Sequence, residues 1–93
     1  MKNNLDDETL KKLAYVSVST YRVKAMKSLE DGQVKIPSNI AKDAGIRSNH
    51  ISKVLTELKE IGAAECINEE ARKGRLYRLT DLGETISDNL EEL

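Results

Sequence analysis

The chain has 93 residues, enough for one hydrophobic core but not for two, and its 39% hydrophobic and 33% charged residues are typical of a folded protein. No apolar run approaches the roughly 20 residues that span a bilayer, and the first ten residues lack the apolar centre of a signal peptide, so we expect a cytoplasmic protein without membrane contact. The net charge of −1 does not by itself indicate a nucleic-acid partner.

The residues that could carry catalysis or bind metal are few and scattered. One cysteine, Cys66, excludes an internal disulfide, and with the single histidine, His50, it cannot supply a Cys/His zinc cluster. No glycine-rich phosphate loop, Ser-His-Asp order or carboxylate pair indicates a catalytic pocket. We therefore predict no enzyme, no cofactor and no metal site. Cys66 lies in the apolar context AECIN, which predicts a small core residue, with a redox-sensor thiol as the alternative.

The first third of the chain is predicted to form two helices. Acidic residues at positions 6–8 suit the positive end of a helix, which we expect over residues 6–14. The β-branched residues and serines of YVSVST predict a break near residues 17–19. A second helix is expected to begin near Ser19 and to end at the Glu-Asp-Gly of residues 30–32. The following QVKI segment is extended and can pair only as a small edge strand.

Residues 38–61 are predicted to form two helices joined by a tight turn. Ser38 and Ser48 are expected to cap the two helix starts, and Gly45 supplies the left-handed residue that ends the first helix. Apolar residues recur at helical spacing through the second helix at Ile51, Val54, Leu55, Leu58 and Ile61. Ala41 followed by Gly45 is the spacing of a helix-turn-helix, whose second helix suits a DNA major groove. A hairpin that only packs a core, or contacts protein, is the alternative.

The last third is predicted to be a β-hairpin followed by a helix. Residues 63–68 and 75–80 alternate apolar and polar side chains as strands do, and Gly74 permits the turn between them. Thr80 and Asp81 are expected to cap a final helix, with Glu84 three residues beyond Asp81 as in a capping box.

This order of elements predicts a winged helix-turn-helix, mainly α with a small β-hairpin wing (α+β). We expect a single domain over residues 1–93. Its parts are a helix-turn-helix at about 38–61, a wing at about 63–80, and terminal helices at 6–14 and 81–92.

Charge is distributed unevenly along the sequence. Residues 47–56 contain two basic residues and no acid, residues 71–80 contain four basic residues and no acid, and residues 81–93 contain five acids and no base. A polyphosphate would be attracted to the first two segments and repelled by the third. Ordinary solvated surface is the alternative reading.

Three segments, YRVKAMKSLEDG, IAKDAGIRSNHISKVLTELKEIGAAEC and RKGRLYRLTDLGETI, resemble small prokaryotic, especially archaeal, winged-helix transcriptional regulators of the broad MarR and ArsR kind. The resemblance covers about residues 19–86. It implies that the second motif helix enters the major groove and that the wing lies along a backbone or the minor groove. The cysteine and histidine ligands of ArsR-type metal sensors are absent, so metal sensing is not implied.

The candidate DNA contacts follow from the apolar stripe and from this resemblance. With the stripe of the second motif helix buried, its polar residues must face outward, where Asn49 could read adenine and Lys53 could reach a guanine or a phosphate. Arg22 could touch the DNA backbone or form a structural ion pair, Arg78 could pair with an acid, and Tyr77 is expected in the core. The full set of candidate DNA-binding residues is Ser38, Arg47, Ser48, Asn49, His50, Ser52, Lys53, Thr56, Arg72, Lys73 and Arg75.

The expected function is sequence-specific binding of double-stranded DNA by a transcriptional regulator, with residues 48–61 in the major groove and residues 69–75 on the backbone. A winged-helix protein–protein interaction module is one alternative. A nonspecific architectural DNA binder is another, although such proteins are usually strongly basic.

Apolar residues in the two terminal segments predict a homodimer, which would match a palindromic operator. The alternative is that both terminal helices fold back on their own domain. The residues concerned are Leu5, Leu10, Leu13, Leu82, Ile86, Leu90 and Leu93.

Overall fold

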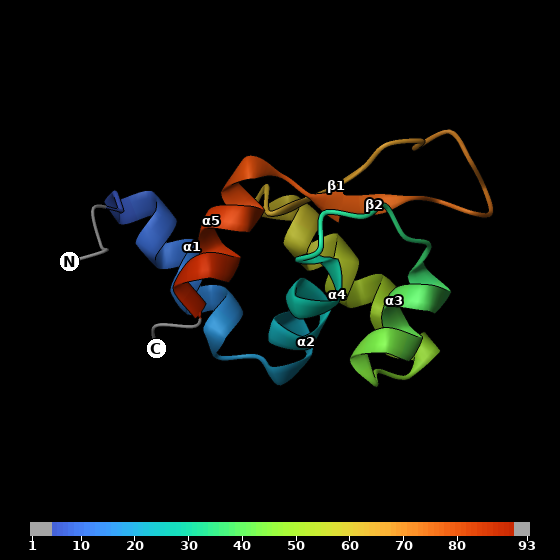
Figure 1. Ribbon diagram of the computed structural model, residues 1–93, viewed down its shortest axis with the longest axis horizontal. Coiled ribbons are helices and arrows are strands. Elements are labelled where there is room, and N and C mark those ends of the chain that lie inside the picture. The colour runs from blue at the N-terminus through green and yellow to red at the C-terminus, as the bar shows by residue number, and fades with distance from the viewer. Residues whose placement is uncertain (1–4, 91–93) are drawn as a thin grey trace.

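The computed structural model describes residues 5–90, which form five helices and one two-stranded antiparallel sheet (Figure 1). The elements are α1 (Asp7–Ser17), α2 (Thr20–Leu29), α3 (Pro37–Ala44), α4 (Ser48–Glu60), β1 (Ala64–Cys66), β2 (Tyr77–Leu79) and α5 (Asp81–Leu90). Helices α1 and α5 lie side by side at one end of the molecule, and α3 lies at the other (Figure 1). No helix within the described residues has both the length and the apolar character needed to cross a membrane.

The core is built mainly by α2 and α4, which pack against each other while α3 packs against both. Each contributes its apolar stripe, as the helical spacing in the sequence predicted. The largest fully buried side chains are Val16, Met26, Leu29, Ile40, Leu55, Leu58 and Ile86.

The first two helices begin at capping side chains. Asp6 Oδ1 accepts the Thr9 backbone N–H at 2.9 Å, and Ser19 Oγ accepts the Arg22 backbone N–H at 3.2 Å. Helix α1 continues to Ser17, three residues beyond the predicted end, because Tyr15, Val16 and Ser17 still fit a last helical turn, in which Ser17 Oγ donates to the Ala14 carbonyl at 3.0 Å. The predicted break near residues 17–19 is confirmed.

The prediction that Ser38 and Ser48 cap the motif helices is wrong. Helix α3 begins one residue earlier, at Pro37, and Ile36 occupies its capping position. Proline favours the first helical position because its fixed φ suits the helix and it has no N–H to leave unpaired. Helix α4 begins at Ser48 itself, after Arg47, and neither helix has a side-chain capping bond.

The turn between α3 and α4 is the one that the sequence predicted. Gly45 has a φ of +70°, and the Ile46 N–H donates to the Ala41 carbonyl at 2.9 Å, which closes the end of α3. Ile46 and Ile51 are buried in the angle between the two helices. The two motif helices are therefore fixed relative to each other by both the backbone and the core.

The hairpin pairs Ala64 with Leu79 and Cys66 with Tyr77. Its strands are shorter than the predicted 63–68 and 75–80, although the Ile67 N–H still donates to the Leu76 carbonyl at 2.9 Å. Cys66 and Tyr77 are buried, as predicted. Between them, Glu65 and Arg78 form the expected ion pair, with 2.8 Å between Glu65 Oε2 and Arg78 Nε.

Helix α5 is capped by Thr80, whose Oγ1 accepts the Gly83 N–H at 3.0 Å. The predicted capping box is wrong, because the capping residue is Thr80 rather than Asp81 and Glu84 then lies four residues away instead of three. Residues 91 and 92 of the predicted final helix lie outside the described residues.

Helices α1 and α5 pack against each other within the chain. Leu13 and Ile86 are buried there, and Leu5, Leu82 and Leu90 are partly buried against the core. Leu10 remains 41% exposed, and Leu93 lies outside the described residues. Most of the apolar surface that suggested a partner is therefore covered by the chain itself.

Candidate nucleic-acid interface

Helix α4 has one buried face and one outward face. Val54, Leu55 and Leu58 point into the core, whereas the predicted contact residues Arg47, Ser48, Asn49, Ser52, Lys53 and Thr56 are exposed and His50 is half-buried. Because successive helical residues are about 100° apart, Asn49 and Thr56 lie along the middle of the outward face. Ser52 and Lys53 lie on opposite sides of that line.

The wing loop, residues 67–76, brings its basic residues to one side of α4. Ser52 and Thr56 of α4 line a groove together with Arg72 and Arg75 of the wing loop, between walls formed by Pro37 and Tyr77. We call this the wing groove. Ser38 and Lys73 are exposed but are not among the described residues that line it. Two polar residues of the helix and two arginines of the loop therefore line one groove, although they are far apart in the sequence.

Asn68, which was not among the residues predicted from the sequence, holds the wing loop in shape. Its Nδ2 donates to the Gly74 carbonyl at 3.1 Å, and its Oδ1 accepts the Leu76 N–H at 2.8 Å. Within the same loop, Arg75 Nε donates to the Ala71 carbonyl at 2.7 Å. Asparagine is a common loop residue because its amide can bond to backbone groups, but the partners of Asn68 lie six and eight residues away and depend on the shape of the loop.

We expect Asn68→Ala to loosen the wing loop without unfolding the chain. The change removes the bonds to Gly74 and Leu76 and the contact from Cys66 Sγ at 3.5 Å. It leaves two backbone groups to water, and the free energy of unfolding should fall by about 1 kcal/mol. Limited proteolysis should then cut at residues 69–75 faster than in the wild-type chain. Asn39→Ala, which changes an exposed asparagine on α3, is the control. Equal cleavage rates in the two variants would contradict this role for Asn68.

The base of the wing loop is tied to the far end of α4. Lys59 Nζ and Glu69 Oε1 lie 2.9 Å apart, and hydrogen bonding to Glu69 raises the pKa of Lys59. Glu57 is also paired, with 3.1 Å between its Oε1 and Arg22 Nε. The structural ion pair predicted as one role of Arg22 is therefore present. Arg22 Nη1 also donates to the Tyr15 carbonyl at 2.8 Å.

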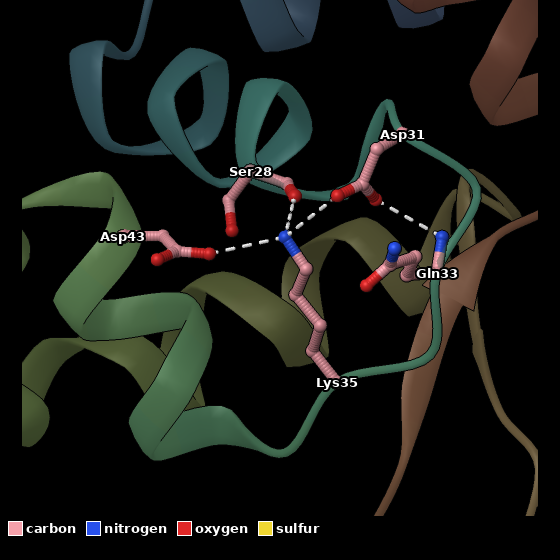
Figure 2. Close-up of polar contacts among 5 residues, drawn as sticks. All are labelled: Ser28, Asp31, Gln33, Lys35 and Asp43. Carbon is pink, nitrogen blue, oxygen red and sulfur yellow. Dashed lines mark hydrogen bonds and ion pairs between the residues drawn. The ribbon is translucent and has the colours of Figure 1, made fainter.

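Lys35 joins three elements, and Figure 2 shows its side-chain contacts with Ser28, Asp31 and Asp43. Its backbone N–H and carbonyl bond to Tyr77 at 2.9 and 2.8 Å, so the predicted edge strand is a single bridge. Its ammonium group bonds to the Ser28 carbonyl at the end of α2. It also lies 3.2 Å from Asp31 Oδ2 and 3.0 Å from Asp43 Oδ2 on α3. Lys35 thereby fixes α2, α3 and β2 in one arrangement.

The charge state of this cluster makes stability depend on pH. Burial of the Lys35 ammonium opposes its charge, but the hydrogen bonds to Asp43 and Asp31 outweigh that effect and raise the pKa of Lys35. The Gln33 N–H and then Lys35 lower the pKa of Asp31. The contribution of Asp31 is therefore complete above its unfolded pKa of about 3.9 and is lost as the pH falls through the lower folded pKa.

We expect Asp31→Asn to flatten the acid side of the stability curve. Thermal unfolding followed by circular dichroism between pH 7 and pH 2 should show a smaller loss of stability on acidification than in the wild-type chain. Asp88→Asn, on the exposed side of α5, should keep the wild-type profile. A profile for Asp31→Asn that parallels the wild type would show that the contacts of the Asp31 carboxylate with the Gln33 N–H and with Lys35 do not stabilise the fold.

The outward face of α4 and the wing loop carry positive charge that the fold does not neutralise. Arg47, Lys53, Arg72 and Lys73 form no ion pair with any described residue. Asn49, Ser52 and Thr56 likewise make no side-chain hydrogen bond within residues 5–90. By contrast, α5 exposes Asp81, Glu84 and Asp88.

The starts of α3 and α4 leave backbone N–H groups available to a ligand. The first N–H groups of a helix have no partner within the helix, and neither motif helix supplies a side-chain cap. Pro37 has no N–H, and the N–H groups of Asn39 and His50 bond to the carbonyls of Ile36 and Arg47, so the available groups are those of Ser38, Ser48 and Asn49. Such groups, combined with the positive end of the helix dipole, favour phosphate oxygens. Ser38 and Ser48 lie exposed in these first turns.

Solved structures with similar folds include two MarR-family transcriptional regulators from Silicibacter pomeroyi. One is 21% identical with a TM-score of 0.72 over 91% of this chain and 57% of that chain. The other, SPO1453 from strain DSS-3, is 13% identical with a TM-score of 0.69 over 92% and 63%. The chain has a winged helix-turn-helix fold. The predicted fold class, mainly α with a β-hairpin wing, is confirmed.

NadR in complex with 4-hydroxyphenylacetate shares the winged helix-turn-helix fold as well. It is 16% identical, with a TM-score of 0.67 over 90% of this chain and 63% of that chain. The present chain thus spans about three fifths of the length of these structures. No protein-family model and no curated protein matches the sequence. At these identities, the likeness establishes the fold.

Proposed function

We propose that this chain is a sequence-specific DNA-binding transcriptional regulator without catalytic activity. In this proposal α4 lies in the major groove of double-stranded DNA and the wing loop lies on the backbone. The MarR-family regulators among the similar structures support the proposal at the level of the fold.

The observation that carries the proposal is the wing groove. Two hydroxyl-bearing residues of α4, Ser52 and Thr56, and two arginines of the wing loop, Arg72 and Arg75, line it together. Phosphate contacts of this kind position a protein on DNA, whereas base contacts determine which sequence is bound. The middle of the outward face of α4 carries Asn49, whose amide can make two hydrogen bonds to adenine.

We also propose that the regulator is a homodimer that joins through α1 and α5. Leu10 is exposed on α1, and Leu82 and Leu90 are only partly buried on α5. A two-fold dimer would place two copies of α4 about one helical turn apart, roughly 34–36 Å along DNA. Sedimentation equilibrium of the wild-type chain and of Leu10→Asp tests this, because only the wild-type chain should associate.

The function is tested by fluorescence anisotropy with a pool of random-sequence duplexes across a salt series, followed by sequencing of the retained DNA. A steep salt dependence with an enriched, palindromic sequence is the expected result. Steep dependence without enrichment would favour a nonspecific architectural binder. Absence of binding at low salt would contradict the proposal and favour a protein-interaction module.

A further inference from the structure

A second groove lies on the other side of α4, between α4 and the start of α2. Ser19, Tyr21 and Arg22 line it from the α2 side, and His50, Lys53 and Glu57 line it from α4. We call it the α2 groove. Tyr21 is 40% exposed, and its ring centroid lies 5.2 Å from that of His50. An aromatic side chain therefore stands beside the outward face of α4 instead of packing into the core.

The charges of the α2 groove fit one anionic group. Arg22 and Glu57 neutralise each other at 3.1 Å, and Arg22 is further held by the Tyr15 carbonyl. The exposed side chain of Lys53 therefore gives the groove a net positive charge. The Tyr21 hydroxyl and a ring N–H of His50 add hydrogen-bond donors.

The dimensions of DNA relate this groove to the wing groove. An α-helix with its side chains is about 10–12 Å across, and the major groove is about 12 Å wide. A helix that fills the major groove therefore has one sugar-phosphate backbone on each side. Ser52 and Lys53 lie on opposite sides of α4, one in the wing groove and the other in the α2 groove.

We propose that the α2 groove is a second phosphate-binding site, which holds the DNA strand opposite the strand held by the wing. Lys53 supplies the charge, and Tyr21 and His50 supply hydrogen-bond donors. This inference rests on the proposed function and deepens it, because it assigns Lys53 to a phosphate and leaves Asn49 and Thr56 to contact bases.

The first test compares salt slopes of DNA binding. Lys53→Gln should reduce the slope of log affinity against log salt by about 1, because one phosphate contact is lost, and should leave the preferred sequence unchanged. Lys24→Gln removes the same charge from an exposed position on α2 outside the groove, and it should keep the wild-type slope. Tyr21→Phe should weaken binding to every sequence about threefold to tenfold without changing the slope.

The second test assigns the strands. Duplexes of the selected sequence would carry single methylphosphonate linkages, which neutralise one phosphate at a time along each strand. In the wild-type chain, affinity should fall when a contacted phosphate is neutralised. Lys53→Gln should remove this loss of affinity at a phosphate on one strand, and Arg72→Gln should remove it at a phosphate on the other strand. Circular dichroism before each measurement ensures that the variants compared are folded.

Two results would overturn the inference while leaving the proposed function intact. One is a change in the preferred base on Lys53→Gln, which would make Lys53 a base contact. The other is that the Lys53 and Arg72 variants both lose the effect of methylphosphonate substitution on the same strand. If the wild-type chain itself shows no salt-dependent binding, the proposed function fails first, and the two failures are thus distinguishable.

Discussion

Gly83→Ala is expected to lower the free energy of unfolding by about 3 kcal/mol, at the upper end of the range for overpacked cores. A Cβ at this position would lie 1.9 Å from the Ala63 carbonyl oxygen and 2.9 Å from its carbon. Both atoms belong to the backbone that leads into β1, so neither can rotate away. Helix α5 would have to move off the hairpin, and the Thr80 cap at its start would be disturbed. Urea unfolding followed by circular dichroism measures the loss.

The matched control for Gly83→Ala is Asp88→Ala, on the exposed side of the same helix. Its stability should stay within about 0.5 kcal/mol of the wild-type value, as is usual for surface positions. A Gly83→Ala chain as stable as this control would mean that α5 does not pack as closely on Ala63 as the structure shows.

Asn49→Ala is expected to remove discrimination at one A·T base pair, by about 1–3 kcal/mol in binding free energy. Asn49 is exposed and makes no side-chain hydrogen bond within residues 5–90, so folding should be unaffected. The measurement compares Kd values for the selected duplex and for duplexes in which each A·T pair is replaced in turn. The wild-type chain should distinguish them at the contacted pair, and the variant should not.

Asn39→Ala provides the comparison for Asn49→Ala, because it changes an exposed asparagine on α3 instead of α4. It should leave the base preference unchanged. A uniform loss of affinity for all duplexes on Asn49→Ala would instead indicate that Asn49 contacts a phosphate.

The order and type of the helices could be predicted from the sequence, because periodic apolar residues and glycine stops are local signals. The Gly45 turn is an example, since φ is positive there and only a few residue types tolerate that geometry. Helix starts were harder to place. A serine near a helix start can cap the helix or can lie in its first turn. At α3 the proline at position 37 takes the first helical position, so Ser38 lies in the first turn.

The outward residues of α4 could likewise be named in advance, because burial of one helical face determines the other. Contacts between distant segments could not. Lys35 has acidic neighbours in the sequence, but its position between α2 and α3 depends on the packing of both helices. The same holds for Tyr21 and His50, whose ring centroids are 5.2 Å apart although the residues lie 29 positions apart in the chain. The close packing of Gly83 on Ala63 could not be predicted either, because a glycine within a helix does not indicate which backbone or side chain packs against it.

In α4, the residues that anchor the helix to the rest of the fold are different from the residues that face outward. Glu57 and Lys59 anchor its last turns through ion pairs, whereas Asn49, Ser52 and Thr56 contribute little to folding. Natural or laboratory selection could therefore vary these three positions almost freely without loss of stability. Libraries randomised at these three codons should yield mostly folded proteins, so a change in what the proposed DNA-binding face recognises can be selected separately from a change in stability.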